Sequence, residues 1–314
     1  MEYDAPNPPS EHERPENTSF EPAIPPPNPP DLPYMTYVEA VVLSLMFIIF
    51  QVFIGVAISI AAIVFGFALG HSWHENPMLE RPELFLAANV FAVFPLLVWG
   101  WWRSGQTVRD ALGLLPFGWA ALAVLVPLGI GTSVLLSELD NLVRWLFPQM
   151  PTLFLDVFET LFSAPLLGFL FVVVMAPFTE EFLFRGVVLR GLLRRHGPWG
   201  ACVVSALLFG LINLNPPQII AGSLVGLVLA AVHLKTGSVW PCVWLHAVFN
   251  AVPVAAFSLF PHEIQGFTSA PEPGVFQPLW LNALGVVLFA IGAMVFILPE
   301  HTVKDADRKG YLRD

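Results

Sequence analysis

Long apolar runs dominate the sequence and are separated by short polar stretches. Each run carries few or no charged side chains, and most approach the length of about 20 residues that an α-helix needs to cross a bilayer. We therefore predict an all-α polytopic membrane protein, a bundle of about eight transmembrane helices. The predicted segments cover about residues 37–69, 84–102, 115–137, 164–187, 198–214, 218–234, 238–258 and 279–298.

Composition supports a membrane protein with no separate soluble domain. Hydrophobic residues make up 56% of the 314 residues, charged residues only 12%, and the mean hydropathy is +0.69. Soluble domains carry about 25% charged residues. The net charge of -10 comes largely from the first 35 residues. Such a charge argues against a nucleic-acid partner, so the expected surroundings are a lipid bilayer.

The chain divides into three parts by composition. Residues 1–34 are rich in Pro and acidic side chains and have little apolar surface to bury, so we expect a disordered tail. Residues 35–300 form the predicted transmembrane helical domain, and residues 301–314 form a cytoplasmic tail. No basic start followed by an apolar stretch marks residues 1–34 as a secretory signal.

Basic residues in the loops predict the orientation of the bundle. Cytoplasmic loops carry an excess of Lys and Arg. With a cytoplasmic N-terminus, most basic loop residues fall on one side, apart from Arg81 and Arg144. We expect an integral protein of a bacterial-type plasma membrane, with both termini cytoplasmic. The residues on that side are Arg103, Arg109, Arg190, Arg194, Arg195, Lys235, Lys304, Arg308, Lys309 and Arg313.

Three ionisable side chains interrupt the apolar segment 164–187 and mark a candidate site. Each charge at the bilayer centre costs roughly 2.5 to 3.5 kcal/mol on insertion scales. Glu181 and Arg185 are four residues apart and can pair on one helix face, while Glu180 is rotated by about 100°. We interpret Glu181 as structural and Glu180 as chemical. The alternative is that all three charges form an architectural clamp between helices.

A proline lies just before these charges. Pro177 has no backbone N–H, so an α-helix through it leaves the carbonyl of Val173 without its usual partner. We expect a kink there that admits water.

Other polar residues interrupt later segments. His246 and Asn250 share a helix face and form a plausible oxyanion-binding pair, although single polar groups in membrane bundles more often make interhelical hydrogen bonds. Glu180 lies about 15 Å of helix from Arg190, and His246 about 17 Å from Lys235, which places both near mid-bilayer. Asn213 fits this depth only with a dipping loop or a tilt. In segment 218–234, Gly222 and Gly226 have the spacing of closely packed helices.

Several intramembrane protease chemistries have no counterpart in the sequence. It contains no His-Glu-x-x-His of zinc metalloproteases, no Gly-x-Ser-x-Gly-like serine motif and no Asp within the predicted spans. Among proteolytic mechanisms, one based on Glu remains.

The polar motifs resemble those of the CAAX prenyl protease and bacteriocin-processing (CPBP) family, which includes the Ras-converting endopeptidases. The resemblance extends from about Ala176 to Asn250, within a family core of about residues 164–258, and the family has eight core helices. Its motifs are Glu-Glu-x-x-x-Arg, Phe-x-x-x-His and His-x-x-x-Asn. They correspond here to Glu180, Glu181, Arg185, Phe209, Asn213, His246 and Asn250, with Thr236–Trp240 also similar to the family.

The resemblance implies an intramembrane endopeptidase and assigns roles by position. Glu180 would be the general base, and His246 and Asn250 would stabilise the oxyanion, with Glu181 and Arg185 supporting the site. Asn213 stands where the family has His, so it could only orient the water, since an amide lacks useful basicity. The cofactor is unknown: a glutamate-activated water is expected, and a divalent metal such as zinc stays open. The substrate would be a peptide or protein entering from the membrane or the cytoplasmic side.

Two other functions remain open at this stage. Loss of the family's His at Asn213 also fits a proteolytically weakened or inactive relative that acts as a membrane scaffold or a bacteriocin-immunity-type protein. An ion-coupled transporter using Glu180 is the third hypothesis, because intramembrane carboxylates mark proton pathways.

Overall fold

The computed structural model describes residues 35–70, 82–147, 164–214, 216–259, 263–269 and 272–297, and these residues contain helices and no strands. The predicted tail 1–34 and residues 301–314 lie outside the described residues. The helices are α1 (Tyr37–Ala68), α2 (Pro82–Ser104), α3 (Val108–Ala111), α4 (Trp119–Leu146), α6 (Pro165–Phe169), α7 (Ala176–Glu181), α8 (Arg190–Leu193), α9 (Pro198–Leu211), α10 (Pro216–Thr236), α11 (Trp240–Leu259) and α12 (Leu279–Ile297), with π-helical turns η2 (Leu170–Met175) and η3 (Phe182–Leu189).

The all-α membrane fold predicted from the sequence is confirmed. Each predicted apolar segment contains a helix, and α6 to α8 form one continuous helix over Pro165–Leu193. Four helical stretches are long and apolar enough to cross a membrane, namely α1, most of α4, α6 to α8, and α10. Shorter apolar stretches occur in α9, α11 and α12. The boundaries differ most at α4, which continues to Leu146 instead of ending near residue 137.

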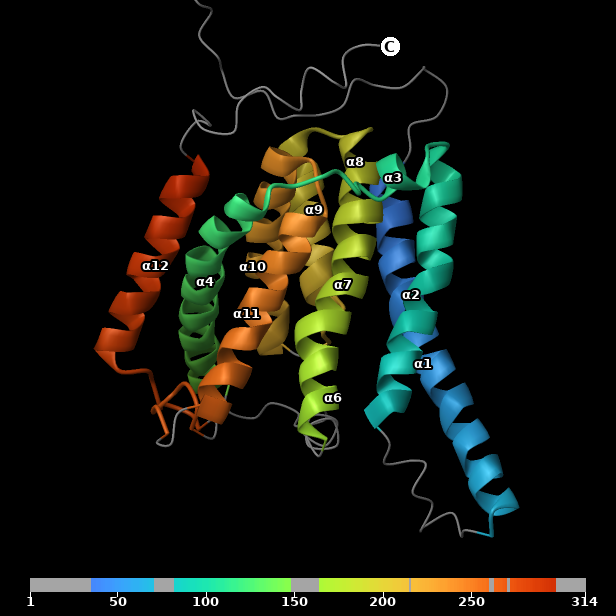
Figure 1. The fold of residues 1–314 in the computed structure, drawn as a ribbon, viewed down its shortest axis with the longest axis horizontal. Helices are drawn as coiled ribbons and strands as arrows, with labels where there is room; N and C mark the ends of the chain where they lie inside the picture. Colours follow the sequence, from blue (N-terminus) through green and yellow to red (C-terminus); the bar gives the residue numbers. More distant parts are fainter. Residues whose placement is uncertain are drawn as a thin grey trace, which may run out of the picture.

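Successive long helices run in opposite directions across the bundle (Figure 1). The closest neighbours are α4 with α12, α9 with α10, α4 with α11, and α1 with α2. At the contact of α9 with α10, a Cβ atom at Gly226 would come within 3.0 Å of the Ala206 backbone. The two glycines of α10 therefore allow the close helix approach that their spacing predicts.

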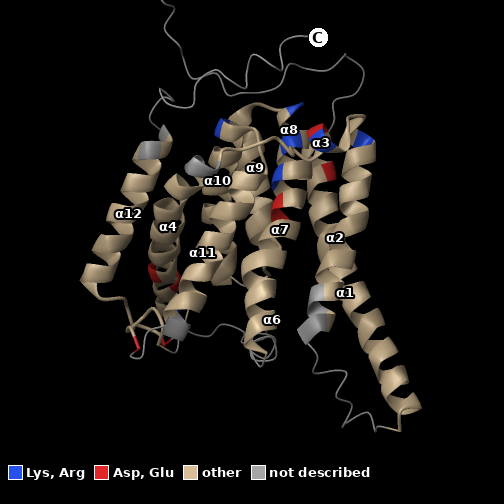
Figure 2. Cartoon of the chain, viewed as in Figure 1, with Lys and Arg blue, Asp and Glu red and all other residues tan. Residues whose placement is uncertain are grey.

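Basic side chains gather at one end of the bundle. Figure 2 shows Lys and Arg at the ends of α2, α3, α8 and α10, while the acidic residues of α4 lie toward the opposite end. At the basic end, Arg103 pairs with Glu39 of α1 at 3.4 Å, and Arg194 donates to the Ser104 carbonyl at 3.0 Å. Those members of the basic group that the structure describes, from Arg103 to Lys235, thus lie at one end, as expected from alternating spans.

The helix that carries the candidate charges runs through the core. Every residue of η3 is buried, and Glu181 and Arg185 have no exposed surface. Apolar side chains of α1, α2, α9, α10 and α11 surround this helix in one hydrophobic cluster. The ionisable groups are therefore held inside the bundle and not at its rim.

Candidate active site

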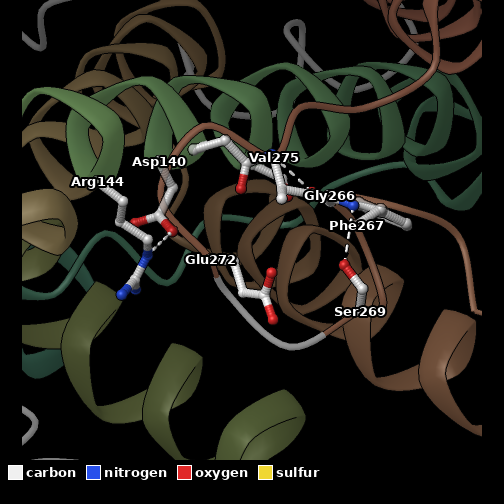
Figure 3. Close-up of a pocket in the computed structure, with 9 residues that line it drawn as sticks. Asp140, Arg144, Gly266, Phe267, Ser269, Glu272 and Val275 are labelled. Atoms are coloured by element: carbon white, nitrogen blue, oxygen red, sulfur yellow. Dashed lines mark hydrogen bonds and ion pairs between the residues drawn. The ribbon is translucent and has the colours of Figure 1, made fainter. Parts of the chain in front are cut away.

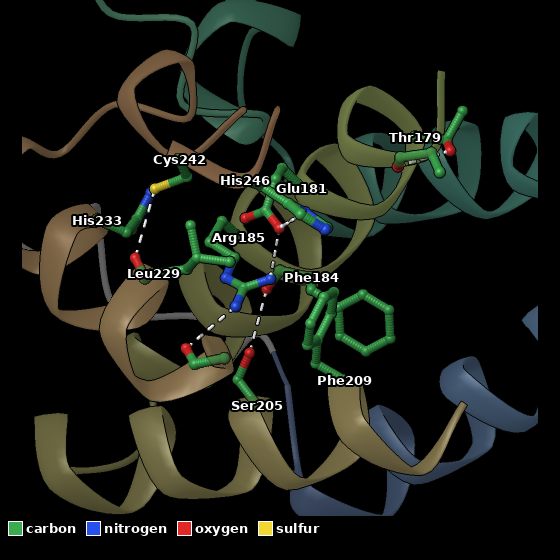
Figure 4. A network of polar contacts seen from close by, with 12 residues as sticks. Thr179, Glu181, Phe184, Arg185, Ser205, Phe209, Leu229, His233, Cys242 and His246 are labelled. Carbon is green, nitrogen blue, oxygen red and sulfur yellow. Dashed lines mark hydrogen bonds and ion pairs between the residues drawn. The ribbon is translucent and has the colours of Figure 1, made fainter. Parts of the chain in front are cut away.

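Glu181 is the centre of a buried polar network. Arg185 Nη1 donates to Glu181 Oε1 at 2.8 Å, which confirms the pairing predicted from the i, i+4 spacing. His246 Nδ1 lies 2.9 Å from the same oxygen (Figure 4). One carboxylate oxygen thus joins the helix of the first motif to α11, the helix of the last motif.

Phe209 and Gly226 complete this network from two further helices. The Arg185 guanidinium lies over the Phe209 ring, with 4.5 Å between Cζ and the ring centroid. The edge-to-face contact of Phe209 with His246 has a centroid distance of 5.5 Å. Arg185 Nη2 donates to the Gly226 carbonyl of α10 at 3.0 Å. Residues from all three family-like motifs therefore meet at one place in the bundle.

The network retains unused hydrogen-bonding capacity. Glu181 Oε2 and Arg185 Nε are buried and have no partner among the described residues. Buried polar atoms in proteins are nearly always hydrogen-bonded, so two orphan atoms on one ion pair are unusual. The ion pair therefore has more hydrogen-bonding atoms than the contacts between the helices use.

Glu180 differs from Glu181 in both exposure and partners. Its side chain is only partly buried, and no described residue forms a hydrogen bond with it. It interacts electrostatically with His246, Glu181 and Arg185, so its carboxylate belongs to the same cluster. The division into a structural Glu181 and a less constrained Glu180 agrees with the helical geometry of the sequence.

Asn250 is anchored by a carbonyl that a proline leaves free. Its Nδ2 donates to the carbonyl of Val172 at 2.8 Å. In η2 the bonds run from residue i to i−5, as in Ala176 N–H to the Phe171 carbonyl. The next donor in this register would be residue 177, a proline, so Val172 is left without a backbone partner. The sequence predicts a missing partner for Val173 in an α-helical register, and the π-helical register extends this effect of the proline to Val172.

Asn213 lies in the turn after α9 and not within a helix. Its Nδ2 is 3.2 Å from the carbonyls of both Phe209 and Gly210. A Cβ atom at Gly222 of α10 would come 3.1 Å from this amide nitrogen. No hydrogen bond joins Asn213 to Glu180, His246 or Asn250 in the described structure.

One polar contact beside the site escaped the sequence analysis. Thr179 Oγ1 donates to Asn89 Oδ1 of α2 at 2.7 Å, and both residues are buried. This bond ties α2 to the residue that precedes Glu180. The available signal was the lone amide of Asn89 in the apolar segment 84–102.

The described part of the chain also contains a polar cavity that lies apart from the Glu181 network. Among the described residues, no group of three or more His, Cys, Asp or Glu side chains could hold a metal ion. A cavity of about 220 Å³ lies between α4 and the segment before α12 (Figure 3), and none of its residues belongs to the Glu181 network. It is lined by Ser137, Asp140, Asn141, Arg144, Gly266, Phe267, Ser269, Glu272 and Val275.

Comparison with known proteins supports the family resemblance. Residues 162–252 match the family model described as type II CAAX prenyl endopeptidase Rce1-like. This range contains the Glu181 network, Glu180, Asn213 and Asn250. No curated protein and no solved structure matches the chain.

Proposed function

We propose that the protein is an intramembrane endopeptidase whose water is activated by Glu180, because residues 162–252 match the Rce1-like family model. The observation that carries this proposal is the convergence of Glu181, Arg185, Phe209 and His246, with the unbonded Glu180 beside them. Inserting a polar cluster of this kind into a membrane costs free energy, so its presence indicates a functional site.

The proposed reaction is the hydrolysis of a peptide bond. Glu180 takes a proton from water, and the water oxygen attacks the carbonyl carbon of the peptide bond. His246, through Nε2 in its protonated form, and the second N–H of Asn250 donate to the oxyanion. The C–N bond then breaks, and the proton held by Glu180 passes to the leaving amine. Asn213 orients the water through its amide.

The setting of this reaction follows from the charge distribution. The Lys- and Arg-rich end of the bundle would face the cytoplasm, so that both termini are cytoplasmic in a bacterial-type plasma membrane. A peptide or protein substrate would reach the site from that side or from the membrane. The roles of the site residues do not require the substrate to carry a prenyl group.

The test uses the full chain in lipid nanodiscs with a library of membrane peptides, both prenylated and unmodified. We expect Glu180→Gln to lower the cleavage rate by about 10² to 10⁴-fold, since it removes the general base but keeps the side-chain shape. We expect Asn213→His to raise the rate, because it restores an imidazole to the position where the family has one. If neither substitution changes cleavage, the assignment of roles is wrong.

One observation favours a second candidate function. The Asn213 amide bonds to its own chain at Phe209 and Gly210, so the group that replaces the family's His is already engaged. This arrangement suits a weakened or inactive relative that acts as a membrane scaffold or bacteriocin-immunity-type protein. A Glu180→Gln variant that still supports the cellular phenotype would favour this candidate over the enzyme.

A further inference from the structure

The network of Glu181 defines which nitrogen of His246 carries a proton. Arg185 can only donate, so the Glu181 oxygen that it contacts is an acceptor. His246 Nδ1 contacts that same oxygen at 2.9 Å and must donate to it. Nδ1 of His246 is therefore the protonated nitrogen in this hydrogen-bond network, and Nε2 is the nitrogen left for other contacts.

The remaining contacts of His246 hold the ring in one orientation. Phe209 packs edge-to-face against the imidazole. One turn further along α11, Asn250 is fixed to Val172. No described residue bonds to Nε2, and the side chain keeps 6% of its surface exposed. The ring is thus held on its Nδ1 side and unoccupied on its Nε2 side.

The charges of the cluster also favour His246 as a donor. Two carboxylates, Glu180 and Glu181, face one permanent cation, Arg185, which leaves one negative charge when both acids are ionised. Uncompensated negative charge in a low-dielectric interior favours hydrogen-bond donors around it. The other imidazole beside Arg185 is that of His233 on α10, which is turned toward the Ser238 carbonyl at 3.2 Å.

We propose that Glu181 is a positioning residue that keeps Nδ1 of His246 protonated and thereby presents Nε2 to the reacting carbonyl. Glu181 has no exposed surface, and its proposed action is exerted through His246. The catalytic consequence rests on the proposed peptidase function, but the state of His246 does not. A carboxylate that orients a histidine in this way acts through the tautomer and the ring angle.

The first experiment measures His246 directly, by solid-state NMR of the full chain labelled with ¹⁵N-histidine in lipid bilayers. The sequence has eight histidines, so the His246→Gln variant identifies the signals of His246. We expect a protonated Nδ1 in the unmodified protein. An unprotonated Nδ1 would overturn the proposal, and this measurement needs no substrate and no destabilising variant.

The second experiment replaces the acceptor. A neutral amide is a weaker acceptor than a carboxylate, so Glu181→Gln should weaken both the preference for a protonated Nδ1 and the hold on the imidazole ring. Where the protein cleaves peptides, kcat should fall by about 10 to 100-fold with KM unchanged. The matched control is Glu138→Gln, which alters a carboxylate of α4 outside the network and should leave the His246 signals unchanged.

The outcomes separate this proposal from the proposed function. A protonated Nδ1 that loses its preference in Glu181→Gln supports the positioning role, even if no peptide is cleaved and the peptidase proposal fails. Cleavage by the unmodified protein, combined with identical His246 signals in Glu181→Gln, would overturn the positioning role alone.

Discussion

Two carboxylate-centred networks in this bundle differ in the charge of their hydrogen-bond donors and in how many carboxylate oxygens are bonded. At one end of α4, Glu138 accepts hydrogen bonds from the side-chain amides of Asn141 and Asn282 and from the backbone N–H of Gln277, at 2.9 to 3.0 Å. Both of its oxygens are used, and every donor is neutral. These bonds tie α4 to the start of α12 and the segment before it.

The network of Glu181 uses charged or ionisable donors and leaves one oxygen unused. Its donors are Arg185 and His246, and the next residue along the chain, Glu180, has no hydrogen bond to a described residue. A carboxylate that is fully bonded to neutral donors holds a loop in place. One that binds an imidazole beside a second, unbonded acid is suited to proton transfer.

The largest expected change in the free energy of unfolding comes from breaking one of two Arg ion pairs that differ in burial. Arg185–Glu181 and Arg144–Asp140 both have i, i+4 spacing, at 2.8 Å and 2.6 Å. The first pair is fully buried, whereas the side chains of the second are 30% and 27% exposed. Arg185→Met should lower the free energy of unfolding by about 3 to 5 kcal/mol, because it leaves a buried carboxylate without its cation.

Arg144→Met is the matched control for this prediction. Exposed pairs contribute about 0 to 1 kcal/mol, so the control should stay close to the unmodified protein. Unfolding in a mixed detergent system, followed by circular dichroism, gives both values. Similar losses for the two variants would contradict the difference in burial on which the comparison depends.

A smaller effect is expected from Glu138→Gln. Hydrogen bonds to a charged group contribute about 1.5 to 3 kcal/mol, and an amide replaces one accepting oxygen of the carboxylate by a donor. Amide hydrogen exchange should become faster around Gln277 and Asn282, while peptide cleavage stays unchanged. A loss of cleavage without faster exchange would assign Glu138 to the chemistry and remove the contrast between the networks.

The sequence predicted those parts of the molecule that depend on local spacing. The apolar segments and the Glu181–Arg185 pair follow from helical periodicity, and both are present. The contact of His246 with Glu181 could not be predicted, because it depends on how α11 packs against α7. The end of α9 at Leu211 was also missed, since apolar residues continue into the turn that holds Asn213.

The π-helical register of η2 was the other feature that spacing could not show. An α-helical register predicts that Pro177 removes the partner of the Val173 carbonyl. In the π-helical register the proline removes the partner of Val172, whose carbonyl accepts from Asn250. His246 and Asn250 share a face of α11, as predicted, but their bonds go to different parts of the neighbouring helix. Asn250 therefore has a structural role in addition to the proposed role in oxyanion binding.

The smallest expected effect concerns this structural role of Asn250. Asn250→Ala should lower the free energy of unfolding by about 1 kcal/mol, near the low end for an unsatisfied carbonyl, because Val172 is only half-buried. In a Pro177→Ala background, the new N–H of Ala at position 177 can reach the Val172 carbonyl, so the same substitution should cost less. The difference between the two backgrounds is the coupling energy of a double-mutant cycle, measured by the same unfolding assay. Equal losses in both backgrounds would mean that the proline does not create the acceptor that Asn250 fills.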